Sequence, residues 1–379
     1  MNDANIHTWR NNLVKHSTLI KKFTSLSLLV LAAFLLSACG AIPANNYAGL
    51  STDGKAVYVA SQSYVFAVDS GNGSVSWQYP AKPEQNLSFF GAPALADGWV
   101  YAGGYNNVAY GFALDGIDPG NPTPTWAFKE YEGKGRLIGA PAVTGDLVLF
   151  PSTDSHLYVI DRISGSLKWR LETGGALWAP AFSDENVAYQ AGLDHFLYAF
   201  DLEQGKLSWK VDLNGPIVGG ITPGEDGILY LGTLNQEMVA VNAENGDILW
   251  RTEVVGNIWS APLLQDGNLY FGTDQKKIYI LSASEGSITR TLDVASSIIG
   301  APVYTDGAVA FVAEDGEVFT LTLDGENRPW TRTIKGKLYT TPVVVNGQIL
   351  LAPFQGDHIL TGYDFQGNLD EKWSGVKPN

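Results

Sequence analysis

A short motif that recurs about every forty residues limits what this chain can fold into. Its clearest copy spans residues 199–209, where an aspartate, a glycine and a tryptophan follow an alanine by two, six and ten residues. Residues 67–77 repeat the same spacing. Two apolar runs joined by a turn that contains aspartate and glycine indicate an antiparallel pair of strands. A tryptophan at a fixed place after each turn therefore predicts a repeated module.

The tryptophans keep this register through most of the chain: Trp77, Trp126, Trp169, Trp209, Trp250, Trp330 and Trp373. Arg290 takes the remaining eighth place, so the eight positions are 40 to 49 residues apart. Forty residues hold four short strands, which is the length of one propeller blade. The sequence therefore predicts an all-β fold, an eight-bladed β-propeller with four-stranded antiparallel blades. Each blade can supply its own four strands, and the sequence leaves open whether residues 40–47 add a closing strand.

The repeat is similar to the quinoprotein-type β-propeller repeat, whose signature is Ala-x-Asp-x-x-Thr-Gly-Lys-x-x-Trp. Residues 67–77 and 199–209 match its alanine, aspartate, glycine and tryptophan, and the resemblance covers nearly all of the chain after residue 47. It implies that the tryptophans dock neighbouring blades and are core residues. By size, blade number and N-terminal motif, the chain also resembles the propeller lipoprotein of the outer-membrane β-barrel assembly machinery.

The N-terminal segment has the features of a bacterial lipoprotein leader. Basic residues precede the apolar run 23–38, which is too short and wrongly flanked to be a membrane span. The run ends in Leu36-Ser-Ala-Cys39, which resembles a lipobox, where lipid is attached to the cysteine; the alternative is an ordinary cleaved signal. Cys39 is the only cysteine, which excludes an internal disulfide and a cysteine metal cluster. We expect a signal peptide over 1–38, a lipidated tether over 39–47 and the propeller over 48–379.

The charge of the chain limits its partners. Its formal net charge is −15, and removal of the basic leader leaves a still more acidic protein. Such a surface repels nucleic acid and anionic lipid headgroups, so we expect no nucleic-acid partner and attachment to the membrane through acyl chains alone. Gly40 stands where an aspartate marks retention at the inner membrane of enteric bacteria. In a host with two membranes we therefore expect the outer membrane, facing the periplasm, and otherwise the outer face of the cytoplasmic membrane.

One face of the propeller is a candidate binding face. Strand parity places on it the crossover loops, which lead from the outer strand of one blade to the inner strand of the next. The insert 115–125 falls on the opposite face. A large apolar side chain stands three residues before each small-residue-plus-proline marker or its Gly220 substitute: Phe90, Ile138, Leu177, Ile217, Trp259, Ile299 and Tyr339. Trp178, which points the other way from Leu177, is a further candidate. We expect this ring to line the channel mouth and grip an apolar partner segment. The alternative is packing between the first two strands.

Catalytic signatures are missing from the sequence. No Ser-His-Asp order, Gly-x-Ser-x-Gly, P-loop or dinucleotide fingerprint occurs, and the histidines His156, His195 and His358 lie in different blades without metal-ligand spacing. Quinoprotein dehydrogenases of the similar repeat family are much longer, and many use adjacent cysteines. We therefore expect no catalytic residues, no metal and no cofactor. The predicted function is that of a non-catalytic scaffold for protein partners at the cell envelope, in outer-membrane protein assembly, monomeric apart from its complexes. The alternative is a minimal quinoprotein dehydrogenase or a ligand-binding sensor.

Overall fold

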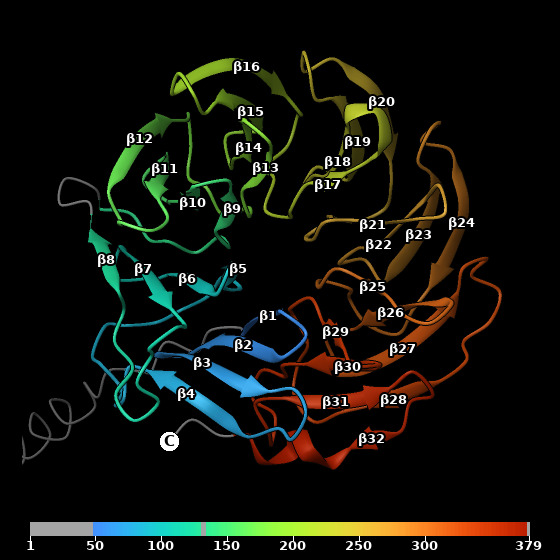
Figure 1. Cartoon of the computed structure of the whole chain (residues 1–379). Helices are drawn as coiled ribbons and strands as arrows, with labels where there is room; N and C mark the ends of the chain where they lie inside the picture. Colours follow the sequence, from blue (N-terminus) through green and yellow to red (C-terminus); the bar gives the residue numbers. More distant parts are fainter. Residues whose placement is uncertain (1–47, 130–133, 377–379) are drawn as a thin grey trace, which may run out of the picture. The chain divides into compact units, whose positions relative to one another are not determined.

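The computed structural model describes residues 48–129 and 134–376. Within them, eight four-stranded antiparallel sheets surround a central axis (Figure 1), and each sheet consists of four strands that are consecutive in the chain. The predicted eight-bladed, all-β fold is therefore confirmed. Residues 46–379 form one compact unit. The predictions for the signal peptide, for the lipidated Cys39 and for the tether concern residues outside the described ranges.

In every blade the first strand lies nearest the axis and the fourth lies at the rim. Blades one to four consist of β1 (Gly49–Thr52), β2 (Ala56–Ser61), β3 (Tyr64–Asp69) and β4 (Val75–Tyr79); β5 (Ala94–Ala96), β6 (Trp99–Gly103), β7 (Val108–Ala113) and β8 (Trp126–Lys129); β9 (Ala142–Thr144), β10 (Leu147–Pro151), β11 (His156–Asp161) and β12 (Leu167–Glu172); β13 (Phe182–Asp184), β14 (Val187–Ala191), β15 (Phe196–Asp201) and β16 (Lys206–Asp212).

The second half of the ring repeats this order. Blades five to eight consist of β17 (Thr222–Pro223), β18 (Ile228–Gly232), β19 (Glu237–Asn242) and β20 (Ile248–Glu253); β21 (Leu263–Gln265), β22 (Asn268–Gly272), β23 (Lys277–Ser282) and β24 (Ile288–Asp293); β25 (Val303–Tyr304), β26 (Ala308–Val312), β27 (Glu317–Thr322) and β28 (Thr331–Thr333); β29 (Val343–Val345), β30 (Gln348–Leu351), β31 (Thr361–Asp364) and β32 (Leu369–Asp370). The 3₁₀ helices are η1 (Glu225–Gly227) and η2 (Glu371–Gly375).

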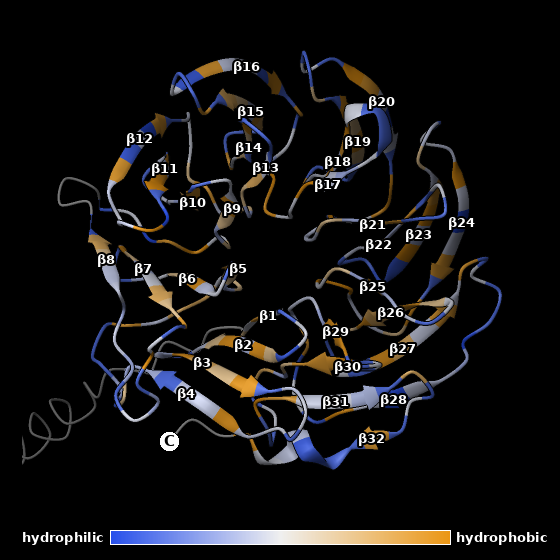
Figure 2. Cartoon of the chain, in the orientation of Figure 1, coloured by the Kyte–Doolittle hydropathy of each residue, from blue (hydrophilic) through white to orange (hydrophobic). Residues whose placement is uncertain are grey.

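Burial differs between the inner and outer strands for a simple reason. The second and third strands of each blade have neighbouring blades on both faces. Their sequences are therefore nearly continuous apolar runs, as in β15. The outer strands are open to solvent on one edge and mix exposed with half-buried residues, as in β16. Figure 2 shows this mixture as alternating hydrophilic and hydrophobic stretches along β12, β16 and β24.

The blades pack against one another through eight apolar clusters, each of which joins residues of two adjacent blades. These clusters are the core of the propeller. The register tryptophans cross the same seams. In five of them the indole N–H donates to a backbone carbonyl of the next blade: Trp126 to Arg162 (3.0 Å), Trp169 to Leu202 (2.8 Å), Trp209 to Ala243 (3.1 Å), Trp250 to Ala283 (3.1 Å) and Trp330 to Phe365 (2.9 Å).

A glycine beside each docked tryptophan explains the fixed spacing of the motif. Gly205 has φ +64°, and a Cβ on it would lie 2.3 Å from a ring atom of Trp169. Likewise, a Cβ on Gly246 would lie 2.7 Å from a ring atom of Trp209. A larger residue would be strained by the positive φ and would also displace the indole. The glycine of the turn and the tryptophan of the preceding blade are therefore parts of one contact.

Arg290 replaces the tryptophan at the seam between blades six and seven. Its guanidinium donates to the carbonyl of Asp324 (3.2 Å) and forms an ion pair with Glu326. The hydrogen bond from Arg290 lowers the pKa of Glu326, and the same bond raises the pKa of Arg290. Gly325 keeps the positive φ of the other seams and lies against the arginine side chain. The geometry of the docking site is thus retained, with a cation in place of an indole.

We expect stability at this seam to depend on ionic strength, because both charged groups are partly exposed and salt screens such pairs. Raising NaCl to about 1 M should destabilise the wild type relative to Arg290→Trp, because the variant places beside Gly325 the indole that the equivalent glycines contact at the other seams. Urea denaturation at low and high salt measures the difference, with Glu326→Gln as the matched control. A wild type and an Arg290→Trp variant with the same salt dependence would contradict the expectation.

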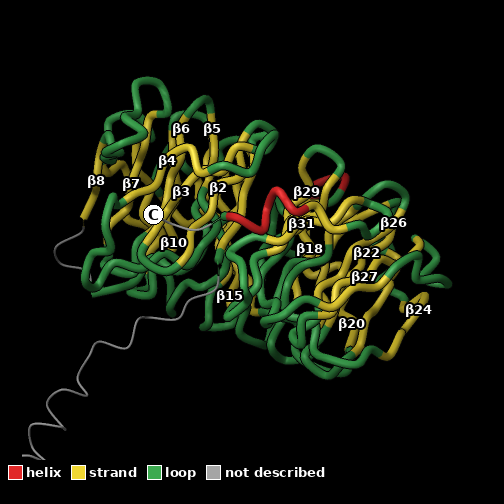
Figure 3. The backbone as a smooth tube through the Cα atoms, turned by 90° about the horizontal axis from the view of Figure 1, so that it is seen from below, coloured by secondary structure: helices red, strands yellow, loops and turns green. Residues whose placement is uncertain are grey.

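The ring closes between blades one and eight without an exchanged strand. The first sheet is β1–β4 and the last is β29–β32, so each of the two blades is complete in itself. Trp373 of η2 is fully buried in the cluster that joins the two blades, and Asn346 Nδ2 donates to Ser70 Oγ (2.9 Å) across the seam. Figure 3 shows η2 in red next to β31.

Candidate functional site

A cavity of about 330 Å³ lies at the channel mouth, where the inner strands begin. Residues from all eight blades line it, and they are short backbone segments that carry apolar or small side chains. The structure brings all six predicted candidates together there: Phe90, Ile138, Trp178, Trp259, Ile299 and Tyr339. Their role in binding a partner remains a prediction.

Leu177 and Ile217 were expected in this ring, and the structure contradicts that expectation. Both side chains are fully buried between blades, and Trp178 and Val218 line the cavity in their place. The N–H of Leu177 donates to the carbonyl of Ser152 in the preceding blade, as the N–H of Ile217 does to Gly192. This hydrogen bond sets the register of the segment. Counting three residues back from the marker selects the wrong residue in these two blades. There the cavity-lining residue lies only two residues before the marker, whereas it lies three before it in the other blades from two to eight.

A local signal would have found Val218. In each of blades two to eight, the cavity-lining residue follows a buried apolar residue and precedes a small one, as in Ile217-Val218-Gly219. The small residue is required because adjacent blades approach closely at this point. A Cβ on Gly300 would lie 2.6 Å from the carbonyl oxygen of Thr340, and one on Gly91 would lie 2.7 Å from the backbone nitrogen of Ala140.

Trp259 is held in place by the turn between β22 and β23. Its indole N–H donates to Asp274 Oδ2 (3.3 Å), and Asn257 donates to the same carboxylate through its backbone N–H and its Nδ2, both at 2.9 Å. These hydrogen bonds fix the carboxylate of Asp274, which is not among the residues that line the cavity. The ring of Trp259 keeps its orientation without a partner, which lowers the entropic cost of binding.

Tyr339, two blades further along the ring, is fixed in a similar way. Its hydroxyl donates to Glu314 Oε1 (3.0 Å), which also accepts from Lys337 Nζ (2.6 Å). These hydrogen bonds, that of Lys337 first, lower the pKa of Glu314 below its usual range. The carboxylate is therefore charged at neutral pH and remains an acceptor for the tyrosine.

Phe90 packs on a second aromatic layer. Its ring centroid lies 5.2 Å from that of Tyr105, and the guanidinium carbon of Arg136 lies 5.0 Å from the centroid of the same tyrosine. Such cation–π and ring contacts hold an exposed aromatic cluster in one arrangement. Blades two and three thus supply a third preorganised aromatic position.

Trp178 differs from the other three aromatic side chains. It is 45% exposed, and within the described residues its indole N–H has no hydrogen-bond partner. An exposed indole with an unused donor can contribute both apolar area and a hydrogen bond to a partner. Trp178 is therefore the strongest candidate for an anchor residue at the mouth.

The cavity does not suit the cofactor of quinoprotein enzymes. Pyrroloquinoline quinone carries three carboxylates and is bound together with a cation, so it needs charged and oxygen-donating side chains. Among the described residues that line the cavity, none has a charged side chain. Elsewhere in residues 48–129 and 134–376, no three His, Cys, Asp or Glu side chains are grouped to hold a metal ion. His156, for example, bonds to the carbonyl of Asp154 (2.9 Å) within its own turn.

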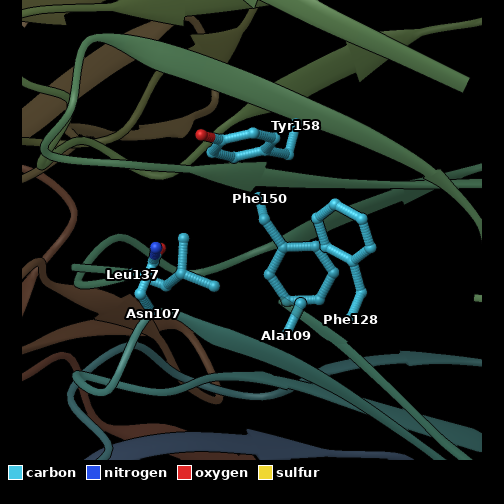
Figure 4. A pocket seen from close by; sticks show the side chains of 6 residues that line it. All are labelled: Asn107, Ala109, Phe128, Leu137, Phe150 and Tyr158. Carbon is cyan, nitrogen blue, oxygen red and sulfur yellow. The ribbon is translucent and has the colours of Figure 1, made fainter. Parts of the chain in front are cut away.

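A second pocket, between blades two and three, has a volume of only about 10 Å³, which is room for a single water molecule. Figure 4 shows the residues that line it: Asn107, Ala109, Phe128, Leu137, Phe150 and Tyr158. Most are core residues of the seam. We regard this pocket as a packing feature.

Eight four-stranded blades, tryptophan-docked seams and an apolar mouth define a propeller of the PQQ-like class. The family model described as outer membrane protein assembly factor BamB matches residues 46–177, 194–288 and 262–328. The chain belongs to this family. No curated protein matches it in sequence. None of the helices in the described part of the chain has the length and apolar character to cross a bilayer.

Solved structures share the fold at low sequence identity. BamB from Moraxella catarrhalis is 18% identical, with a TM-score of 0.68 over 84% of this chain and 94% of the other. The computationally designed Ika8 protein is 13% identical, with a TM-score of 0.70 over 86% and 98%. Quinohemoprotein alcohol dehydrogenase from Comamonas testosteroni is 13% identical, with a TM-score of 0.68 over 81% and 70%. The fold therefore occurs in an assembly factor and in an enzyme, and it does not by itself choose between them.

Proposed function

We propose that this protein is a non-catalytic propeller, anchored by lipid outside the cytoplasm, that binds a protein partner at its channel mouth. The observation that carries the proposal is the uncharged cavity of about 330 Å³, which is lined by all eight blades and ringed by large apolar side chains. An apolar protein segment placed there buries its surface against a preorganised wall. Aromatic residues such as Trp178, Trp259 and Tyr339 are the types that dominate binding energy at interfaces.

Membership of the family described as outer membrane protein assembly factor BamB supports a place in the cell envelope. The sequence Leu36-Ser-Ala-Cys39 supports attachment by lipid, and Gly40 supports the outer membrane in a host that has one. We infer that the protein serves the assembly of outer-membrane proteins as a scaffold and is itself monomeric. Its acidic surface disfavours nucleic acid as a partner.

The lining of the cavity also bears on the enzymatic alternative. A minimal quinoprotein dehydrogenase would have to hold a tricarboxylate and a cation, and the part of the mouth that the structure describes offers neither charged lining side chains nor a carboxylate cluster. A stoichiometric change in the absorbance of pyrroloquinoline quinone on mixing with the protein and Ca²⁺ would reverse this preference.

The anchor is tested by the change Cys39→Ser. We expect the wild type to incorporate a radiolabelled fatty acid and to sediment with membranes, and the variant to lose at least nine tenths of both signals, because Cys39 is the only thiol in the chain. Ser37→Ala, in the same motif, is the matched control and should be labelled normally. Label retained on the Cys39→Ser protein would contradict the lipid anchor.

A further inference from the structure

The path of the chain links the anchor to the channel mouth. The first described strand, β1, is the innermost strand of blade one, and its residues Gly49 and Leu50 line the cavity. Ala48 is buried directly before them. From the mouth, β1 runs toward the opposite face, where it turns into β2. The segment that precedes residue 48 therefore joins the propeller at the channel mouth, next to the innermost strand of blade one.

The length of the connection limits how far the mouth can lie from a lipid at Cys39. Eight residues lie between Cys39 and Ala48, and the nine steps from one to the other span about 30 Å when the chain is fully extended. The insert 115–125, between β7 and β8, lies on the far face of the ring. A short tether attached at the rim favours orientations in which the mouth, and not the insert, is directed toward the bilayer.

We propose that the channel mouth is the membrane-proximal end of the propeller and that its partner is an uncharged, apolar segment of a protein at the surface of the same membrane. This inference rests on the proposed lipid anchor. It extends that proposal by stating which face of the propeller is directed toward the membrane and which chemical class of partner the mouth binds.

The uncharged lining of the mouth indicates which class of partner it can bind. Because the described residues that line the cavity carry no charge, a charged group inserted against them would lose its hydration without compensation. The carboxylate of Asp274 stands behind the lining at Trp259 and has no cation partner among the described residues, so an acidic segment is disfavoured further on that side of the mouth. The free N–H of Trp178 supplies a donor for a backbone carbonyl of the segment. Apolar segments with aromatic residues are common where proteins meet the membrane surface, which agrees with this chemistry.

Proximity to the membrane would also raise affinity without new contacts. A tether that confines the mouth near the bilayer converts the encounter with a membrane-bound segment into a nearly intramolecular one. The effective concentration falls with roughly the −3/2 power of tether length, so lengthening the connection from nine residue steps to twenty-nine should lower it about sixfold.

Energy transfer to the membrane tests the orientation. Lipidated full-length protein is reconstituted into phosphatidylcholine vesicles that contain an acceptor dye on the headgroups. A donor dye is attached at Ile299→Cys in the mouth or at Thr123→Cys in the insert, and lipidation of Cys39 leaves the new thiol as the only reactive one. We expect at least twofold more transfer from position 299 than from position 123. Twenty Gly and Ser residues inserted after Gly40 should reduce this difference.

Each other outcome contradicts a defined part of the proposal. Equal transfer from the two positions, or more from position 123, would overturn the orientation while leaving the anchor intact. A wild type that does not associate with the vesicles would overturn the anchor and the orientation together.

A crosslinking experiment tests the class of partner. A photoreactive residue at Ile138 should crosslink in cells to a membrane-associated protein through an apolar, uncharged peptide. Crosslinks to phospholipid or glycan alone, or to an acidic peptide, would overturn the proposed class of partner.

Discussion

Trp373→Ala is expected to lower the free energy of unfolding by about 3–5 kcal/mol, the range for emptying a large aromatic site in a core. Trp373 has no exposed surface and packs in the cluster that joins blade one to blade eight. Its indole N–H donates to Gln348 Oε1 (2.9 Å), and Gly362 lies so close that a Cβ on it would be 2.4 Å from the ring. The truncation leaves both a cavity and an unpaired amide oxygen.

The effect should be large because, in the described part of the chain, blades one and eight share neither a connecting segment nor an exchanged strand. Their sheets are held together by packing and by a few hydrogen bonds such as that from Asn346 to Ser70. Chemical denaturation followed by circular dichroism measures the loss. Trp169→Ala is the matched control, since Trp169 is 36% exposed and its removal should cost clearly less. Equal midpoints for wild type and Trp373→Ala would show that the seam between blades one and eight does not limit stability.

Trp178→Ser is expected to weaken partner binding tenfold or more, about 1.4 kcal/mol, while leaving the fold intact. The side chain is 45% exposed at the mouth and supports no neighbouring residue through a hydrogen bond in the described part of the chain. Its loss removes apolar area and the free indole donor from the binding face. Binding is measured with the wild-type crosslinking partner, purified, by titration on membranes.

The neighbouring residue provides the control for this prediction. Leu177 is fully buried in the seam between blades three and four, so Leu177→Ser should lower the free energy of unfolding by about 2–5 kcal/mol. At temperatures where the Leu177→Ser protein is folded, its affinity for the partner should be close to that of the wild type. If Trp178→Ser binds normally, the mouth is not the binding face, and the loop 115–125 becomes the next candidate.

The sequence by itself determined the periodic part of the structure. The spacing between turn glycine and tryptophan, repeated at residues 67–77 and 199–209, was sufficient to predict eight blades of four strands. It succeeded because hairpin turns and buried strands depend on interactions within about ten residues. Arg290 could be placed in the tryptophan register for the same reason. Strand parity was enough to put the crossover loops on one face and the insert 115–125 on the other.

The tertiary structure alone decided which side chains face the mouth and how the ring closes. Residues 177 and 178 lie in an irregular segment, where strand alternation does not apply, and the N–H of Leu177 finds its acceptor in the preceding blade. The contacts that fix Trp259 and Tyr339 join residues 15 and 25 positions apart. Closure depends on Trp373 and on residues of blade one that are about 300 positions away in the chain. Such interactions are set by packing between blades, for which the local pattern of residues carries no signal.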